Sequence, residues 1–77
     1  MVITTREQAW EIWKEHAPAV RAYLQKRTKD IALTDDLTQE VAIRVYDACC
    51  CGKEIKNIRA WLFQIAYHAL VDHYKEA

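Results

Sequence analysis

Apolar residues recur at steps of three and four positions in the first third of the chain, which is the period of an α-helix. This stripe runs through Trp10, Trp13, Ala17, Val20 and Leu24. Thr5 with Gln8 three positions later is typical of a capping box, so a first helix is predicted over residues 5–28. Pro18 has no backbone N–H and crowds the carbonyl four residues earlier, and we therefore expect the helix to be kinked near Pro18.

A second helix is predicted over residues 35–49. Thr34 is placed to cap it, and Asp35 and Asp36 would then lie in its first turn, where the helix macrodipole stabilises carboxylates. Gly52 can adopt the left-handed conformation that commonly ends a helix, so it is expected to follow the last turn of this helix. The inner stripe of this helix consists of Leu37, Val41, Val45 and Ala48.

A third helix follows Asn57, which is placed to cap it, and this helix is apolar on nearly all sides. We therefore expect it to lie centrally and to expose only one edge, and the chain to fold as an all-α, compact three-helix bundle. Its inner face comprises Ile58, Trp61, Leu62, Ile65, Ala66, Ala69 and Leu70, with a second apolar strip of Phe63, Tyr67, Val71 and Tyr74. One narrow polar stripe remains, formed by Asn57, Gln64, His68, Asp72 and Lys75.

The composition is that of one small globular domain, with 77 residues, 52% of them hydrophobic, one Gly and one Pro. A chain this short does not enclose a large cavity, so its function is expected on its surface. The net charge of zero conceals a segregation, because residues 17–29 carry four basic and no acidic side chains, whereas residues 30–48 carry five acidic and one basic. This pattern suits one anionic and one cationic partner, with an ordinary solvated surface as the alternative.

No apolar run is longer than four residues, the length of the run from Ala48 to Cys51, which is far shorter than the roughly 20 residues of a membrane-spanning helix. No basic-then-apolar leader follows Met1, so we expect a soluble, cytoplasmic protein with no membrane partner. Cys49, Cys50 and Cys51 project about 100° apart on a helix and cannot jointly bind one zinc ion, so no metal is expected. Reduced thiols are the expected state, with a redox switch as the open alternative.

Enzymatic activity is not expected. The chain contains no serine, no glycine-rich phosphate loop and no pair of carboxylates placed to form a catalytic pocket. We therefore predict a non-enzymatic domain without a cofactor.

Two blocks of the sequence stand out together: residues 34–46, TDDLTQEVAIRVY, and residues 58–67, IRAWLFQIAY, followed by VDHY at residues 71–74. At this spacing they resemble region 2 of the extracytoplasmic-function sigma factors of bacterial RNA polymerase. The resemblance is close over residues 34–74 and looser over residues 12–29. It implies that residues 1–77 form a single sigma region 2 domain, truncated before the second domain, region 4, that reads the −35 promoter element. It further implies three partners: the clamp coiled coil of the largest subunit of core RNA polymerase, the promoter −10 element, and an anti-sigma factor.

The second helix carries the surface expected to bind the polymerase. Asp36, Gln39, Glu40 and Arg44 lie at helical spacing on one face, where they can pair with a basic partner helix. The resemblance implies that this face, together with Ile43, contacts the polymerase clamp. On composition alone, the same side chains would be a solvated surface, since exposed charge pairs contribute little.

The 49–57 loop and the third helix are expected to recognise and melt the −10 element. Promoter opening needs cations that hold phosphates and a planar wall that receives an unstacked base. The residues assigned to this task are Lys53, Lys56, Asn57, Arg59, Trp61, Gln64, Tyr67 and His68. The alternative for Trp61 is core packing, and the alternative for Lys53 and Lys56 is an ordinary hydrated loop.

Two positions depart from the family pattern. Many members have an aromatic residue where Gly52 stands and an asparagine where His68 stands, so the preferred base is left open. A rival interpretation is a helical interaction module without a DNA role, which would bind a protein through the second helix or through the face of Trp10 and Trp13. A helix-turn-helix repressor is disfavoured because the third helix is too apolar to lie in a major groove.

Overall fold

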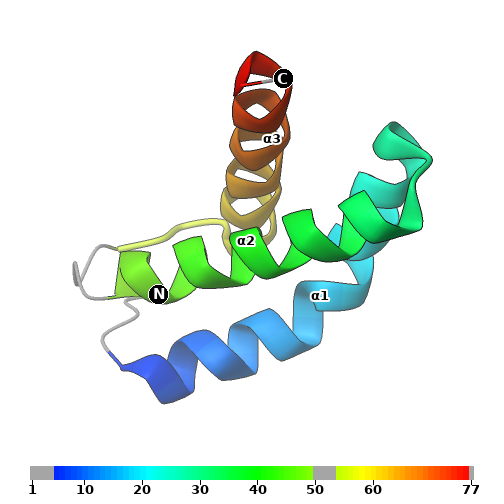
Figure 1. Cartoon of the computed structure of the whole chain (residues 1–77). Coiled ribbons are helices and arrows are strands. Elements are labelled where there is room, and N and C mark those ends of the chain that lie inside the picture. The colour runs from blue at the N-terminus through cyan, green and yellow to red at the C-terminus, as the bar shows by residue number, and fades with distance from the viewer. Residues whose placement is uncertain (1–4, 50–53, 77) are drawn as a thin grey trace.

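The computed structural model describes residues 5–49 and 54–76 and contains three α-helices. These are α1, Arg6–Thr28, α2, Ile31–Cys49, and α3, Ile58–Glu76. Figure 1 shows α1 and α2 running side by side in opposite directions, with α3 standing across them. The predicted all-α three-helix bundle is confirmed.

The beginning of α1 matches the predicted capping box. The Thr5 hydroxyl oxygen accepts a hydrogen bond from the Gln8 amide at 3.1 Å, and the Gln8 side-chain oxygen accepts one from the Thr5 amide at 3.3 Å. Pro18 lies inside the helix, and the axis of α1 bends in Figure 1 where the colour passes from blue to cyan. Lys29 ends the helix in the left-handed conformation with φ of 56°, so α2 begins only two residues later.

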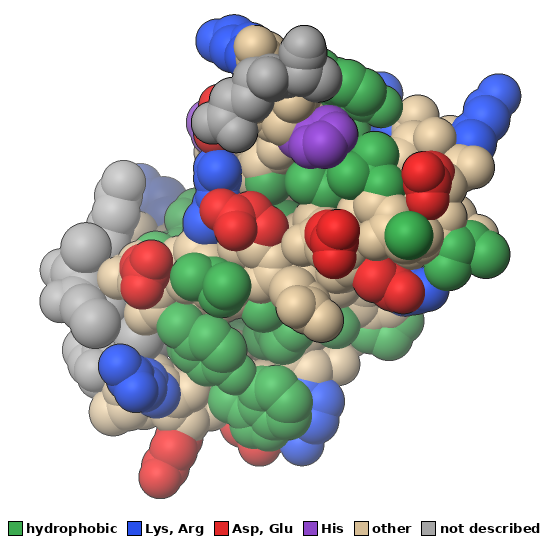
Figure 2. Space-filling model, viewed as in Figure 1, with side chains coloured by type: hydrophobic (Ala, Val, Ile, Leu, Met, Phe, Trp, Pro, Cys, Tyr) green, Lys and Arg blue, Asp and Glu red, His purple; other side chains and the backbone are tan. Residues whose placement is uncertain are grey.

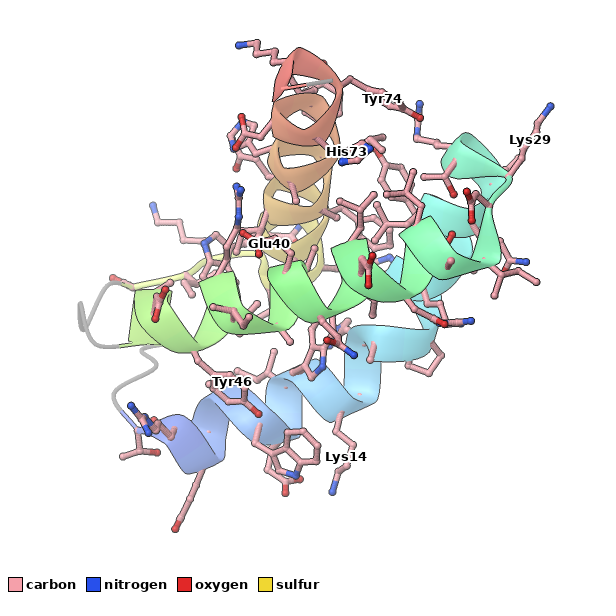
Figure 3. All side chains as sticks on the ribbon, in the orientation of Figure 1. Lys14, Lys29, Glu40, Tyr46, His73 and Tyr74 are labelled. Carbon is pink, nitrogen blue, oxygen red and sulfur yellow. The ribbon has the colours of Figure 1, made fainter. Side chains whose placement is uncertain are left out.

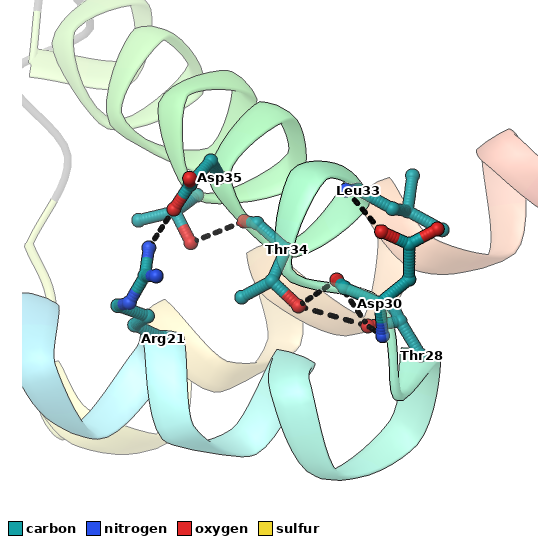
Figure 4. Close-up of polar contacts among 7 residues, drawn as sticks. Arg21, Thr28, Asp30, Leu33, Thr34 and Asp35 are labelled. Carbon is teal, nitrogen blue, oxygen red and sulfur yellow. Dashed lines mark hydrogen bonds and ion pairs between the residues drawn. The ribbon is translucent and has the colours of Figure 1, made fainter.

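The predicted start of the second helix is wrong, because α2 begins four residues earlier and Thr34 is not its cap. Asp30 holds that position, with its carboxylate accepting a hydrogen bond from the Leu33 amide at 3.1 Å. Thr34 is fully buried inside α2, and its hydroxyl donates to the Asp30 carbonyl at 2.7 Å and lies 2.8 Å from the Thr28 hydroxyl (Figure 4). Asp35 therefore lies beyond the first turn and forms an ion pair with Arg21 of α1 instead.

Asn57 caps α3 as predicted, since its side-chain oxygen accepts a hydrogen bond from the Ala60 amide at 3.0 Å. The buried core draws on all three helices and on Ile55, which lies between α2 and α3. Its residues are Ala9, Ile12, Trp13, Val20, Leu24, Leu37, Val41, Val45, Ile55, Leu62, Ala66, Ala69 and Leu70. Within the described residues, no helix is long and apolar enough to cross a bilayer.

Burial departs from the apolar spacing at two places. Trp10 belongs to the apolar stripe of the first helix but is 49% exposed, because Ala9 and Ile12 occupy the core-facing positions. The third helix was expected to be central, yet Tyr67 and Tyr74 are 51% and 54% exposed. The reason is that α1 and α2 pack mainly against each other, so that α3 lies across the pair and part of its second apolar strip stays exposed.

Candidate functional site

The outer side of α2 presents most of the residues assigned to polymerase binding. Asp36, Gln39 and Glu40 are exposed, and Ile43 is 55% exposed. The opposite side of the helix is anchored in the core by residues such as Val41, and this fixes which side faces outward. Figure 2 shows acidic side chains gathered along α2, so this surface is predominantly anionic.

Arg44 and its neighbour Glu40 are already engaged with each other within the domain, and Arg44 also reaches α3. Its guanidinium donates to Glu40 at 3.2 Å and, across to α3, to Asp72 at 3.0 Å. The hydrogen bond with Asp72 is the main reason that the pKa of Arg44 is raised above its ordinary value. Figure 3 shows Glu40 on the side of α2 toward α3. Arg44 thus ties the two helices together.

An apolar groove borders the anionic surface. It has a volume of about 720 Å³ and lies between the beginning of α1 and the end of α2, with Trp10, Ile43 and Tyr46 among its walls. Hydrophobic side chains gather over this part of the molecule in Figure 2, and Figure 3 shows Tyr46 extending from α2 toward α1. Sequence reasoning did not predict this groove, because it considered the face of Trp10 and Trp13 only as the binding surface of the rival interpretation and gave Tyr46 no role.

The polar stripe of α3 is exposed as its helical spacing predicts. Gln64 and His68 are both exposed, and the Tyr67 ring lies beside that of His68, with a centroid separation of 6.1 Å and a tilt of 54°. Trp61 is partly buried and packs against the core, in line with its alternative as a packing residue. The stripe therefore presents hydrogen-bonding groups next to an accessible aromatic ring.

The basic residues near the beginning of α3 fall into two groups. Lys56 and Arg59 are exposed, and the Arg59 guanidinium lies over the Phe63 ring, 5.3 Å from its centroid. Lys53, Gly52 and the cysteines Cys50 and Cys51 lie outside the described residues, as does the side chain of Cys49. Among the side chains that the structure describes, no three metal-ligating groups come together.

Comparison with known proteins identifies the family. The profile of the family described as Sigma-70 region 2 matches residues 12–77. The chain is 33% identical over 66 residues to the ECF RNA polymerase sigma factor SigM of Bacillus subtilis (strain 168), a match that covers 86% of this chain and 40% of that protein. It is 30% identical over 67 residues to the ECF RNA polymerase sigma factor SigL of Mycobacterium tuberculosis (strain ATCC 25618 / H37Rv), covering 86% of this chain and 38% of that protein.

The chain thus spans less than half the length of these relatives. No solved structure matches it significantly. The family match extends over both sequence blocks and over most of α1, α2 and α3. The chain therefore belongs to the sigma-70 region 2 family and is a region 2 domain of the ECF sigma factor type.

Proposed function

We propose that this domain acts in transcription initiation in the bacterial cytoplasm, where it binds core RNA polymerase through α2 and the melted −10 strand through α3. The observation that supports this most is the exposure of two chemically different surfaces on two helices. Gln39 and Glu40 lie on the anionic outer side of α2, and Gln64 and His68 lie on the exposed stripe of α3.

The polymerase surface combines an apolar centre with a polar border. The groove beside Ile43 and Tyr46 offers apolar area to a partner helix, and the neighbouring Gln39 and Glu40 supply hydrogen-bond acceptors and charge. Protein interfaces commonly have this arrangement, with a desolvated apolar core and a hydrated polar rim. A basic coiled coil such as the polymerase clamp is the expected partner, and an anti-sigma factor would act by covering the same surface.

Retention of core polymerase on the immobilised domain tests this half of the proposal. The Gln39→Ala, Glu40→Ala double variant should retain less polymerase than the wild type, because it removes hydrogen-bonding groups and a charge from the polar border of the proposed contact. Glu15→Ala, Gln25→Ala is a matched control, since it removes the same residue types from exposed positions on α1. Equal retention by the two double variants would contradict the assignment of α2.

The DNA surface pairs polar groups with an aromatic ring. A single-stranded segment can stack an unpaired base on Tyr67 while Gln64 and His68 hydrogen-bond to base edges. Lys56 and Arg59 lie near the beginning of the same helix, where they can hold phosphates. The departure from the family pattern at His68 leaves the preferred base to experiment.

Fluorescence anisotropy with single-stranded oligonucleotides tests this half. Binding of a −10 oligonucleotide should weaken with rising salt, and Gln64→Ala and His68→Ala should reduce the preference for it over a scrambled sequence. Gln25→Ala on α1 is the control, with the same substitution at an exposed site. Retention of polymerase without any DNA binding would instead support the interaction module that lacks a DNA role.

A further inference from the structure

Two arginines and two aromatic rings form a row that runs from the end of α1 to α3. The Arg27 guanidinium lies over the Tyr23 ring, 4.6 Å from its centroid. Tyr23 meets Phe63 of α3 edge to face, with centroids 5.3 Å apart and planes at 87°. Arg59 lies over the other ring, 5.3 Å from the Phe63 centroid. We call these four residues the cation–aromatic row.

The arginines of the row differ from the cations that carboxylates hold in place. Of the described basic side chains, Lys14, Arg21 and Arg44 are held by carboxylates. Neither Arg27 nor Arg59 takes part in an ion pair within residues 5–49 and 54–76, and both are exposed. Stacking on a ring orients a guanidinium but leaves its N–H groups at the edge available to an incoming anion.

The surroundings of the row extend this chemistry. A depression of about 600 Å³ beside it is lined by Tyr23, Lys26, Arg27, Leu70 and Tyr74, with no acidic side chain among them. Figure 3 shows Tyr74 on the side of α3 toward the end of α1. Cations alternating with accessible rings are the arrangement on which proteins bind single-stranded nucleic acid, because phosphates meet the cations and bases stack on the rings.

The row is also continuous with the stripe of α3. Phe63 and Tyr67 are four residues apart on the same helix and are therefore neighbours on its surface. Tyr67 in turn lies beside His68. Exposed His68 and Tyr67 and half-buried Phe63 and Tyr23 thus lead around α3 from the proposed −10 surface to the basic end of α1.

We propose that the end of α1 is a second DNA contact, in which Lys26 and Arg27 bind backbone phosphates of the same single strand that α3 engages. Arg59 stands at the α3 end of the row, and the depression beside Tyr23 and Tyr74 receives a base or sugar of the continuing strand. This inference rests on the proposed function of α3 in DNA binding. It adds α1, to which neither the sequence blocks nor the polar stripe assigns a DNA role.

The test compares single-stranded oligonucleotides that share one −10 core but extend to different lengths on either side. The Lys26→Gln, Arg27→Gln variant removes two cations from α1 without touching the stripe of α3. Arg6→Gln, Lys14→Gln removes the same two residue types from the beginning of the same helix and serves as the matched control. Circular dichroism melting of each variant establishes that it is folded.

Extension of the oligonucleotide should raise the affinity of the wild type and of the control, but not that of the Lys26→Gln, Arg27→Gln variant. Loss of two phosphate contacts should also reduce the slope of log K against log salt by about 1.4 for a single strand. Between about 50 and 200 mM salt, the wild type should therefore lose about sevenfold more affinity than the variant. Arg27→Lys should retain most of the salt slope, since the charge remains.

The outcomes separate this inference from the function on which it rests. One result would overturn the second contact alone. In it, His68→Ala weakens binding of the unextended −10 oligonucleotide, but extending the oligonucleotide does not raise the affinity of the wild type, and the α1 variant has the same salt slope as the wild type. Loss of slope in the α1 variant without any effect of His68→Ala would support the contact and overturn the role of the stripe. Failure of the wild-type domain to bind any oligonucleotide would overturn both.

Discussion

Removal of the Asp72 carboxylate should loosen the attachment of α3 to α2 by a small and measurable amount. Asp72→Asn retains the size of the side chain but abolishes the ion pair with Arg44, whose Nη2 lies 3.0 Å from Oδ2. The Arg44 and Asp72 side chains are 33% and 52% exposed, so solvent screening limits the expected coupling to about 0.2–1 kcal/mol. In a domain of this size each 1 kcal/mol shifts Tm by about 4–8 °C, so Tm should fall by no more than about 8 °C.

A double-mutant cycle measures the pair itself. Arg44→Gln, Asp72→Asn and the double variant would be unfolded in urea and followed by circular dichroism, and the coupling free energy calculated from the four proteins. Glu11 and Lys14 form a matched control pair, because they lie 3.4 Å apart within one helix and are 68% and 58% exposed. The Arg44–Asp72 coupling should exceed that of the control pair and should shrink in high salt.

A coupling equal to that of the control pair would refute the view that Arg44 holds α3 in place. The internal contacts of Arg44 also affect binding, because a guanidinium that donates hydrogen bonds to Glu40 and Asp72 has fewer N–H groups left for the polymerase. Arg44→Gln should therefore reduce polymerase retention less than Gln39→Ala combined with Glu40→Ala does. The opposite order would show that Arg44 leaves its internal partners when the polymerase binds.

Further predictions concern stability. Asp30→Ala should cost about 0.5–2 kcal/mol in urea unfolding because Asp30 caps α2, whereas Asp36→Asn, beyond the first turn, should change the free energy of unfolding by less than about 0.5 kcal/mol. Leu62→Ala should cost about 2–5 kcal/mol, since Leu62 is fully buried, and a variant as stable as the wild type would contradict that packing. The pKa of Arg44 is higher in the folded than in the unfolded protein. Its contribution to the free energy of unfolding is therefore complete below the unfolded-state pKa and is lost only as pH rises through the higher folded-state pKa. The destabilisation by Asp72→Asn should thus be equal at about pH 7 and about pH 9, and a difference in thermal melts between the two would count against this ion pair.

Local motifs in the sequence predicted the ends of two helices correctly. The capping box at Thr5 and the cap at Asn57 depend on neighbours three positions away, so the sequence contains all that is needed to recognise them. Thr34 was misassigned because a threonine hydroxyl can cap a helix or bond to the carbonyl four residues before it, and the local sequence favours neither. The contact of the Thr34 hydroxyl with that of Thr28 favours the bond to the Asp30 carbonyl, and this contact exists only after α1 and α2 have packed.

The candidate surfaces were predictable to the extent that they follow a helical wheel. Gln39 and Gln64 are exposed because opposite faces of their helices are apolar, and the period reveals this directly. The groove around Trp10 was not predictable, since Trp10 continues the apolar spacing of α1 while Ala9 takes the buried position. The cation–aromatic row was equally hidden, because it joins α1 to α3 and no local pattern links residues so far apart.

The two uses of arginine in this domain fit the proposal that one small fold binds two partners of opposite charge. Arg21 and Arg44 pair with carboxylates of α2 and α3 and hold the helices together, which neutralises part of the acidic run. Arg27 and Arg59 stack on aromatic rings instead, so carboxylates do not neutralise their positive charge at the α1–α3 contact. If the two surfaces act together, saturation of the domain with core polymerase should leave the salt slope of its DNA binding no less steep than in the isolated domain. A polymerase that instead displaced the DNA would place both partners on the same surface and contradict the separation of charge.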